Sequence, residues 1–235
     1  MENLVFVTAT WARNEEEKIR ILESVRALSL FNFPIIIGDR LDTRIPLADD
    51  LRKISNVSVI ERHGSLYAQR ADAYREAAKI GKNIFWIESD KRDFIEKELK
   101  NILAVTDFEG GILLPYPDRD SFQKYPQFQR TIEDCINSLI NEFISINKHF
   151  TYGPMLFPSS IVSFLDKTNN EFGWGINIFL AMIGYAKKIS IKYVPIVVSH
   201  DKDVQIGEEL KRFRLEQIKD YIVAIQEASK IAESF

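Results

Sequence analysis

Two carboxylates end a short apolar run in the segment NIFWIESDKRDF, residues 83–94. Residues two apart on a strand point to the same side, so Glu88 and Asp90 would lie together if the strand continued through them. Carboxylate oxygens suit Mg²⁺ or Mn²⁺ in sites that substrate phosphates complete. The pair therefore predicts a divalent metal site. The alternative is that Asp90 caps a helix beginning near Arg92 and that Glu88 binds nothing.

A histidine follows another apolar run near the end of the chain. His200 comes after YVPIVVS and precedes Asp201 and Asp203. A neutral imidazole is a common metal ligand, so His200 is the candidate third ligand beside Glu88 and Asp90. The alternative for a single histidine in this setting is an ordinary turn residue.

Polar side chains also end two apolar runs in the first forty residues. The segment from Thr8 to Asn14 follows LVFV, and Asp39 follows PIIIG. In open α/β sheets, ligands bind beyond the carboxyl ends of the strands. Together with residues 88–90 and 199–203, these polar ends are therefore expected to share one edge of a sheet and to form a site there.

Charged residues and glycines beside these ends have both functional and ordinary interpretations. Arg13 and Glu15 are within reach of a nucleotide, or else belong to a solvated first helical turn that the helix dipole stabilises. Arg70 is expected to face phosphates, or else to form a surface salt bridge. Two glycines flank Trp174 before an apolar helix. They would admit a ligand close to the backbone, or else form a tight turn.

The apolar periodicity of the chain predicts the scaffold for these residues. Compact β-branched runs alternate with amphipathic segments in the order β-α-β-β-α-β over the first ninety residues. The predicted strands are 3–10, 33–39, 56–62, 83–90, 110–116, 150–158 and 190–203. The predicted helices are 14–28, 65–81, 92–105, 127–148, 173–189 and 207–235. We expect one α/β domain, with a mostly parallel (mixed) sheet flanked by helices and a long C-terminal helix.

Two helices carry further expectations about packing. The helix at 127–148 is expected to turn inward Ile132, Ile136, Leu139, Phe143 and Ile146. Its Cys135 is interpreted as an inert thiol on the apolar face. The terminal helix carries an apolar stripe of Leu210, Phe213, Ile218, Tyr221, Ile225, Ala228 and Ala232. This stripe packs on its own domain or on a second subunit, and its length favours a homodimer.

The composition excludes several classes of partner and location. The 235 residues are 46% hydrophobic and carry a net charge of −3, which offers no general attraction for nucleic acid or anionic membranes. No apolar run approaches the roughly 18 residues of a membrane span. The N-terminus lacks the basic and apolar regions of a signal peptide. We expect a cytoplasmic protein with small-molecule partners.

The order of these segments resembles the nucleotide-diphospho-sugar glycosyltransferases of the GT-A fold. The segment WARNEEEKI (11–19) looks like their PARNEE, with Trp11 in place of the proline. The segment AQRADAYREAAKIGKNIFWIESDK (68–91) is similar to the stretch that ends in their DxD motif. The segment GWGINIFLAMIGYAKKISIKYVPIVVSH (173–200) is similar to a pattern of glucosyl-3-phosphoglycerate and mannosylglycerate synthases. The resemblance covers roughly residues 3–203.

The resemblance implies roles for individual residues. The residues implied at the nucleotide site are Thr8, Ala12, Arg13, Glu15 (at the base), Asp39 (near the nucleoside) and Arg70. Glu88 and Asp90 fall on the metal-binding DxD motif, and His200 falls on a histidine that binds the metal. Asn177 stands where the synthases carry an acid that contacts the acceptor. Asp90 and Asn177 are therefore the candidate catalytic residues.

The implied activity is transfer of a sugar from a nucleotide-diphosphate donor to an unidentified acceptor, with Mg²⁺ or Mn²⁺ and with a preference for retention. Residues 1–105 would form the nucleotide-binding half, 106–206 the acceptor-binding half and 207–235 the C-terminal helix. Glu88 and Asn177 depart from the family pattern and leave open a non-catalytic protein that binds sugar nucleotides or glycans. A nucleotidyltransferase is less favoured, because no GxGxR loop follows the first strand.

Overall fold

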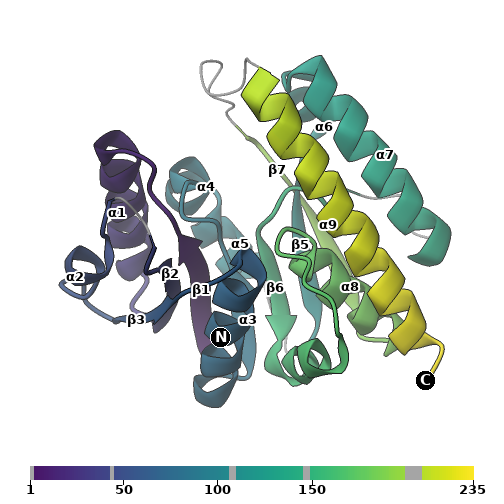
Figure 1. Cartoon of the computed structure of the whole chain (residues 1–235), viewed down its shortest axis with the longest axis horizontal. Coiled ribbons are helices and arrows are strands. Elements are labelled where there is room, and N and C mark those ends of the chain that lie inside the picture. Colours follow the sequence, from purple (N-terminus) through teal and green to yellow (C-terminus); the bar gives the residue numbers. More distant parts are fainter. Residues whose placement is uncertain (1–2, 43–44, 106–109, 145–148, 199–207) are drawn as a thin grey trace.

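A computed structural model describes residues 3–42, 45–105, 110–144, 149–198 and 208–235 (Figure 1). The strands are β1 (Leu4–Thr10), β2 (Ile35–Arg40), β3 (Val57–Arg62), β4 (Asn83–Trp86), β5 (Ile112–Pro117), β6 (Met155–Pro158) and β7 (Ile191–Ile196). The helices are α1 (Glu15–Ser29), α2 (Ala48–Leu51), α3 (Leu66–Ile80), α4 (Arg92–Lys97), α5 (Leu99–Val105), α6 (Arg119–Gln123), α7 (Gln127–Ile144), α8 (Ile176–Ala186), α9 (Glu208–Ala232) and the 3₁₀ helix η1 (Ser159–Lys167).

The described strands form one mixed sheet in the order β3-β2-β1-β4-β6-β5-β7. Strand β6 runs antiparallel to β4 and β5, and all other neighbouring strands are parallel. The predicted mixed sheet is therefore confirmed. The carboxyl ends of β1, β2, β4 and β7 share one edge of it. The strand order reverses between β1 and β4, which is the point of an open α/β sheet where ligands bind.

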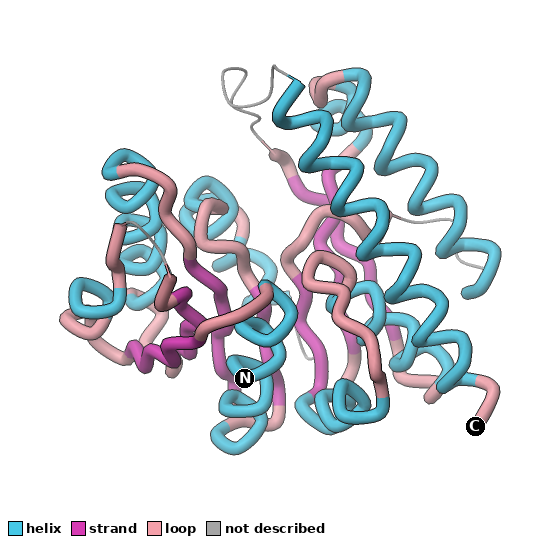
Figure 2. The backbone as a smooth tube through the Cα atoms, in the orientation of Figure 1, coloured by secondary structure: helices cyan, strands magenta, loops and turns pink. Residues whose placement is uncertain are grey.

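Helices cover both faces of the sheet (Figure 2). Successive residues of a strand point to opposite faces, and β1 is apolar on both. Leu4 and Phe6 pack in a core with side chains of α1, α4 and α5. Val5 and Val7 pack in a second core with side chains of α3, α7, α8 and α9. With both faces buried, β1 is anchored in both cores, and the polar loop that follows it begins at the carboxyl edge of the sheet.

Several boundaries differ from the prediction. The helix predicted at 92–105 is split into α4 and α5 at Glu98. The strand predicted at 83–90 ends at Trp86, because the chain turns at residues 89–90. The short helices α2, α6 and η1 were not predicted. Helices α2 and α6 have only four and five residues, too few for a helical period to show in the sequence.

The predicted face of α7 was wrong for two residues and for the thiol, and Ile146 lies outside the described residues. Leu139 and Phe143 are 40% and 54% exposed, and Cys135 is exposed as well. The side chains of α7 that enter the core are Ile132, Ile136, Ile140 and Ile144. These isoleucines recur at every fourth residue and form one stripe along a helix. This stripe takes the position that the sequence pattern assigned to Leu139 and Phe143.

Helix α9 packs within its own chain, against α8 and α7 (Figure 1). Ala224, Ile225 and Ala228 are buried in the core, which agrees with packing on its own domain. Leu210 lies outside the residues whose side chains are described. The homodimer through α9 stays a prediction, and Leu215 and Ile222 are the exposed apolar residues of this helix. Within the described parts of the chain, no helix is both long and apolar enough to cross a bilayer.

Candidate active site

The carboxyl ends of β1 and β2 fix Asp39 at the predicted edge. Thr10, its register partner, donates a hydrogen bond from Oγ1 to Asp39 Oδ1 over 2.6 Å. Gln69 of α3 ties the two strand ends together, because its Nε2 donates to the carbonyls of Thr10 and Gly38 at 2.8 and 2.7 Å. Burial raises the pKa of Asp39, against the opposing hydrogen bond from Thr10. Asp39 is thus a buried, oriented carboxyl.

The loop between β1 and α1 places the other predicted nucleotide contacts at different depths. Thr8 and Ala12 are buried. Arg13 and Glu15 are exposed at the start of α1. The Arg13 guanidinium forms an ion pair with Glu17, and Glu15 and Glu16 are exposed acids of the first turn. Only Arg13 and Glu15 of these four therefore present their side chains to solvent.

Trp11 forms a flat apolar surface directly after the end of β1. Its side chain is 50% exposed, and the Arg40 guanidinium lies 5.4 Å from its ring centroid. Arg40 is held in turn by Asp42, with Nε to Oδ1 at 2.9 Å. An exposed indole beside a buried carboxyl is suited to stacking on a planar base, because every base has a π-face. The sequence had marked Trp11 only as a replacement for proline.

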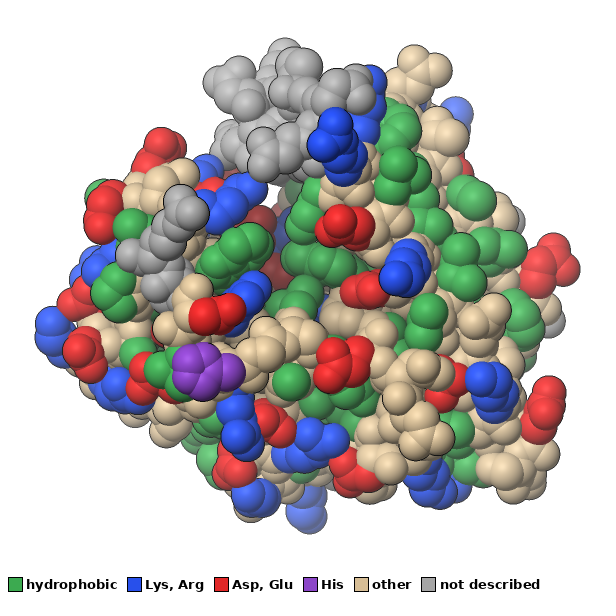
Figure 3. Space-filling view, viewed as in Figure 1, with side chains coloured by type: hydrophobic (Ala, Val, Ile, Leu, Met, Phe, Trp, Pro, Cys, Tyr) green, Lys and Arg blue, Asp and Glu red, His purple; other side chains and the backbone are tan. Residues whose placement is uncertain are grey.

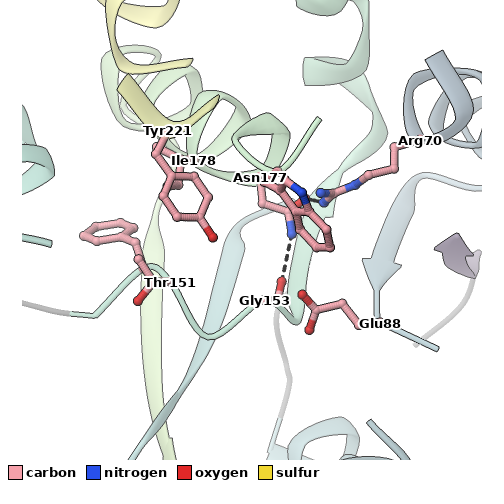
Figure 4. A pocket seen from close by; sticks show the side chains of 9 residues that line it. Arg70, Glu88, Thr151, Gly153, Asn177, Ile178 and Tyr221 are labelled. Carbon is pink, nitrogen blue, oxygen red and sulfur yellow. Dashed lines mark hydrogen bonds between the residues drawn. The ribbon is translucent and has the colours of Figure 1, made fainter. Parts of the chain in front are cut away.

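Glu88 and Asp90 follow β4 but do not share a strand face. Ser89 Oγ donates to the Ala9 carbonyl over 3.0 Å, which anchors the turn to the end of β1. Glu88 is directed into a pocket, whereas Asp90 is exposed (Figure 4). The expected continuation of the strand is wrong. The capping alternative is wrong too, because Lys91 occupies the N-cap position of α4 and makes no side-chain cap.

The Glu88 carboxylate lies against Gly153, in the loop before β6. Gly153 has a φ of +115°, and a Cβ on it would lie 2.2 Å from Glu88 Oε2. Glu88 Oε2 is shut off from solvent and accepts no hydrogen bond from the described residues. Burial raises the pKa of Glu88 to about 7, with Lys91 opposing the shift and Asp90 adding to it. Glycine is thus needed here both for the backbone and for the space that Glu88 occupies.

Arg70 and Asn177 belong to one buried network (Figure 4). Arg70 donates from Nη1 to the Gly173 carbonyl at 2.7 Å and from Nη2 to Asn177 Oδ1 at 2.8 Å. Tyr74 Oη also donates to Asn177 Oδ1, at 2.7 Å. Asn177 Nδ2 donates to the Gly153 carbonyl at 2.8 Å. The network joins α3 and α8 to the loop that supports Glu88.

These residues surround a small pocket between α3, β4, α8 and α9, with a cavity volume of about 20 Å³ and an opening to solvent. It is lined by Arg70, Glu88, Phe150, Thr151, Gly153, Trp174, Asn177, Ile178 and Tyr221. Figure 3 shows the surface hollowed between the β1 side of the molecule and α9, with charged side chains in the hollow. The sequence predicted Glu88, Arg70 and Asn177 for this region, and the structure brings them together.

The donor set for a metal is incomplete within the described residues. No group of three or more His, Cys, Asp or Glu side chains stands together there. His200 lies outside the described residues, although β7 ends at Ile196 on the same edge of the sheet. Glu88 and Asp90 supply carboxylate oxygens, and the buried Glu88 Oε2 accepts no hydrogen bond. Carboxylate oxygens of this kind suit a hard cation that takes its other ligands from water and phosphate.

The raised pKa of Glu88 predicts a pH-dependent stability in the absence of metal. The pKa of Glu88 is about 7 in the folded chain, against 4.5 for an ordinary glutamate. The folded state therefore holds the proton more tightly than the unfolded state. The stabilisation that this difference gives to the folded state is complete below pH 4.5. It decreases by at most about 3 kcal/mol as the pH rises to about 7. Between these pH values, the Tm of the wild type should fall relative to that of Glu88→Gln. Parallel melting curves would contradict this assignment.

The comparisons with known proteins rest on structure alone, since no family profile matches the sequence and no curated protein matches it. Glucosyl-3-phosphoglycerate synthase from Mycobacterium tuberculosis, solved with Mn²⁺, UDP and phosphoglyceric acid, superimposes with a TM-score of 0.63 at 12% identity. The match covers 96% of this chain and 78% of that one. The chain has the GT-A fold.

Other structures of the same synthase agree with this result. The complex with Mn²⁺, UDP-glucose and phosphoglyceric acid gives a TM-score of 0.63 at 13% identity, over 94% of this chain and 79% of that one. The complex with Mg²⁺ and UDP gives 0.61 at 12% identity, over 96% and 79%. The resemblance seen in the sequence motifs is thus confirmed for the GT-A fold over nearly the whole chain.

Several residues of the site were not identified from the sequence, among them Gln69, Tyr74 and Thr151. Gly153 and Lys91 were not considered, and Thr10 was included only as part of the segment 8–14. Gly153 stands between Tyr152 and a proline, and an isolated glycine before proline is a turn signal. That signal marks a bend, but it does not identify the carboxylate that packs on the bend.

Proposed function

We propose that the protein is a cytoplasmic glycosyltransferase that takes a nucleotide-diphosphate sugar as its donor and Mg²⁺ or Mn²⁺ as its cofactor. The observation that carries the proposal is the position of Glu88. Its carboxylate faces a pocket at the carboxyl edge of the sheet, beside the β1–β4 switch point. Solved neighbours of this fold hold UDP or UDP-glucose together with Mn²⁺ or Mg²⁺, which supports the same ligand class here.

The donor would lie across the ends of β1, β2 and β4, in the half formed by residues 1–105. Trp11 and Glu15 are available to the base, and Asp39 to the nucleoside. Asp90 and Glu88 would hold the cation, with His200 as the proposed third ligand. When bound, the cation offsets the negative charge that develops on the leaving diphosphate.

We propose that Arg70 and Asn177 act by positioning. Their hydrogen bonds join α3 and α8 to the Gly153 carbonyl, and Gly153 supports the Glu88 carboxylate. Asn177 Oδ1 already accepts hydrogen bonds from Arg70 and Tyr74. The acceptor would enter from the side of residues 106–206, where Thr151 lines the pocket.

We propose retention of configuration at the transferred sugar. An inverting enzyme needs a base on the acceptor hydroxyl, and Glu88 is the one carboxylate among the described residues that line the pocket. With Glu88 assigned to the cation, the leaving diphosphate is the available base. The bond from the sugar C1 to the phosphate oxygen breaks, the bond from C1 to the acceptor oxygen forms, and the acceptor proton passes to the diphosphate.

A second candidate is a protein that binds sugar nucleotides or glycans without turnover. Two contacts favour it. Both functional groups of the Asn177 side chain are engaged within the protein, and Lys91 lies 3.8 Å from the Glu88 carboxylate. Release of nucleoside diphosphate from a bound sugar nucleotide separates the two functions, because only a transferase or its slow hydrolytic side reaction produces it.

The proposed function predicts a metal-dependent thermal shift with sugar nucleotides. A ligand at one hundred times its Kd raises the free energy of unfolding by about 2.7 kcal/mol. For a chain of this size that raises Tm by roughly 5–10 °C. The Asp90→Ala variant should lose the part of this thermal shift that requires Mn²⁺. Asp93→Ala is the control, since Asp93 forms an exposed ion pair with Lys97 on α4 and should respond like the wild type. No shift with any UDP, GDP or ADP sugar in the presence of Mn²⁺ would reject the proposal.

A further inference from the structure

We propose that Lys91 is a built-in cation for the donor diphosphate, so that the pocket binds a nucleoside diphosphate even without a divalent metal. This inference rests on the proposed sugar-nucleotide site. It adds a protein ligand that the DxD resemblance did not imply. Lys91 directly follows Asp90 and leads into α4, so the end of β4 that carries the carboxylates also carries this ammonium group.

The Lys91 ammonium group lies beside Glu88, which lines the pocket. Its Nζ is 3.8 Å from Glu88 Oε2 and 5.1 Å from the centroid of the Tyr152 ring. A separation of 3.8 Å is a charge contact, too long for a hydrogen bond. Among the described residues, the three N–H donors of this group have no hydrogen-bond acceptor. The side chain is 30% exposed, so a ligand can reach it.

The other cations near this edge already have protein partners. Arg70 donates to the Gly173 carbonyl and to Asn177. Arg40, which lies over the Trp11 ring, donates hydrogen bonds to the Asp42 carboxylate. Arg13 is paired with Glu17 on the first turn of α1. Lys91 thus combines a position beside Glu88 with donors that a phosphate oxygen can accept.

The ammonium group of Lys91 stands beside the carboxylates of the proposed metal site and weakens that site for a metal. Its positive charge reduces the negative charge that Glu88 and Asp90 present. A divalent cation is therefore attracted less strongly. A phosphate group, which the carboxylates alone would repel, finds a compact ammonium partner.

The test is the affinity of the purified full chain for UDP, GDP and ADP, measured by calorimetry in EDTA and again with Mn²⁺. The tightest diphosphate is then compared with its own nucleoside. In EDTA, Lys91→Gln should weaken the diphosphate by about tenfold or more, since a hydrogen bond to a charged group is lost. Its affinity for the nucleoside should stay within about twofold of that of the wild type. Lys91→Arg should recover part of the loss.

Two variants guard against trivial effects. Lys97→Gln removes an exposed lysine of the same helix and should bind as the wild type does. The double variant Glu88→Gln, Lys91→Gln leaves no uncompensated charge at this position, so it remains folded if Lys91→Gln alone does not. It should show the same weakened binding of the diphosphate in EDTA.

Each outcome separates the inference from the proposed function. Binding that needs Mn²⁺ in the wild type supports the glycosyltransferase site and overturns the role of Lys91. Equal affinities of the wild type and Lys91→Gln in EDTA overturn it too. If no diphosphate binds under either condition, both the proposed function and the inference are rejected.

Discussion

Gly153→Ala should destabilise the protein by about 2–6 kcal/mol and remove its metal-dependent response to nucleotides. The backbone at φ +115° strains any residue with a Cβ, by about 1–3 kcal/mol. The added Cβ would also lie 2.2 Å from Glu88 Oε2. Relief of that overlap must move the loop or the carboxylate, at a further cost of about 1–3 kcal/mol. Chemical denaturation and a thermal-shift assay with Mn²⁺ measure the two effects.

Gly64→Ala is the matched control for this substitution. Gly64 has the same φ of +115°, but a Cβ there would meet no atom within 4 Å. It should therefore show the backbone strain alone and keep the nucleotide response. The difference between the two variants isolates the contact with Glu88. Equal losses of stability would show that Gly153 serves only the turn.

Arg70→Ala should cost about 3–5 kcal/mol of stability and lower Tm by roughly 10 °C. It removes the hydrogen bonds to the Gly173 carbonyl and to Asn177. It also removes a guanidinium whose carbon lies 4.0 Å from the centroid of the buried Trp86 ring, a contact worth up to about 2 kcal/mol when desolvated. Calorimetric melting of the variant gives the shift.

Arg75→Ala, on the same helix, separates the loss of this network from the loss of an arginine. Arg75 forms ion pairs with Asp72 and Asp166 at the surface, and such pairs contribute about 1 kcal/mol or less. With two such pairs lost, its Tm should fall by no more than roughly 8 °C. If the two variants melted together, the buried network would not be the feature that joins α3 to α8.

The succession of strands along the first ninety residues and the shared polar edge could be predicted from the sequence. Both follow from local patterns, because buried runs identify strands and the polar residue after each run identifies its end. Asp39 illustrates this, since it ends PIIIG in the sequence and ends β2 in the structure. The antiparallel β6 carried no comparable signal, because only four residues of the predicted segment 150–158 form the strand.

The roles of Arg70 and Gly153 depend on contacts that local patterns do not contain. Arg70 and Asn177 are 107 residues apart, and nothing near Arg70 in the sequence distinguishes a buried arginine from a surface one. The fit of Gly153 to Glu88 likewise requires β6 to lie beside β4. The outward turn of Leu139 has the same kind of cause, because four isoleucines of α7 compete for one core face.

The most direct test of the proposed site is the location of its ligands in a crystal. Crystals of the protein soaked with Mn²⁺ and UDP should show an anomalous peak at the carboxylates of Asp90 and Glu88. Diphosphate density should bridge this peak to the ends of β1 and β4, with the base near Trp11. Manganese bound away from both carboxylates, or UDP bound on another face of the sheet, would contradict the proposed glycosyltransferase site.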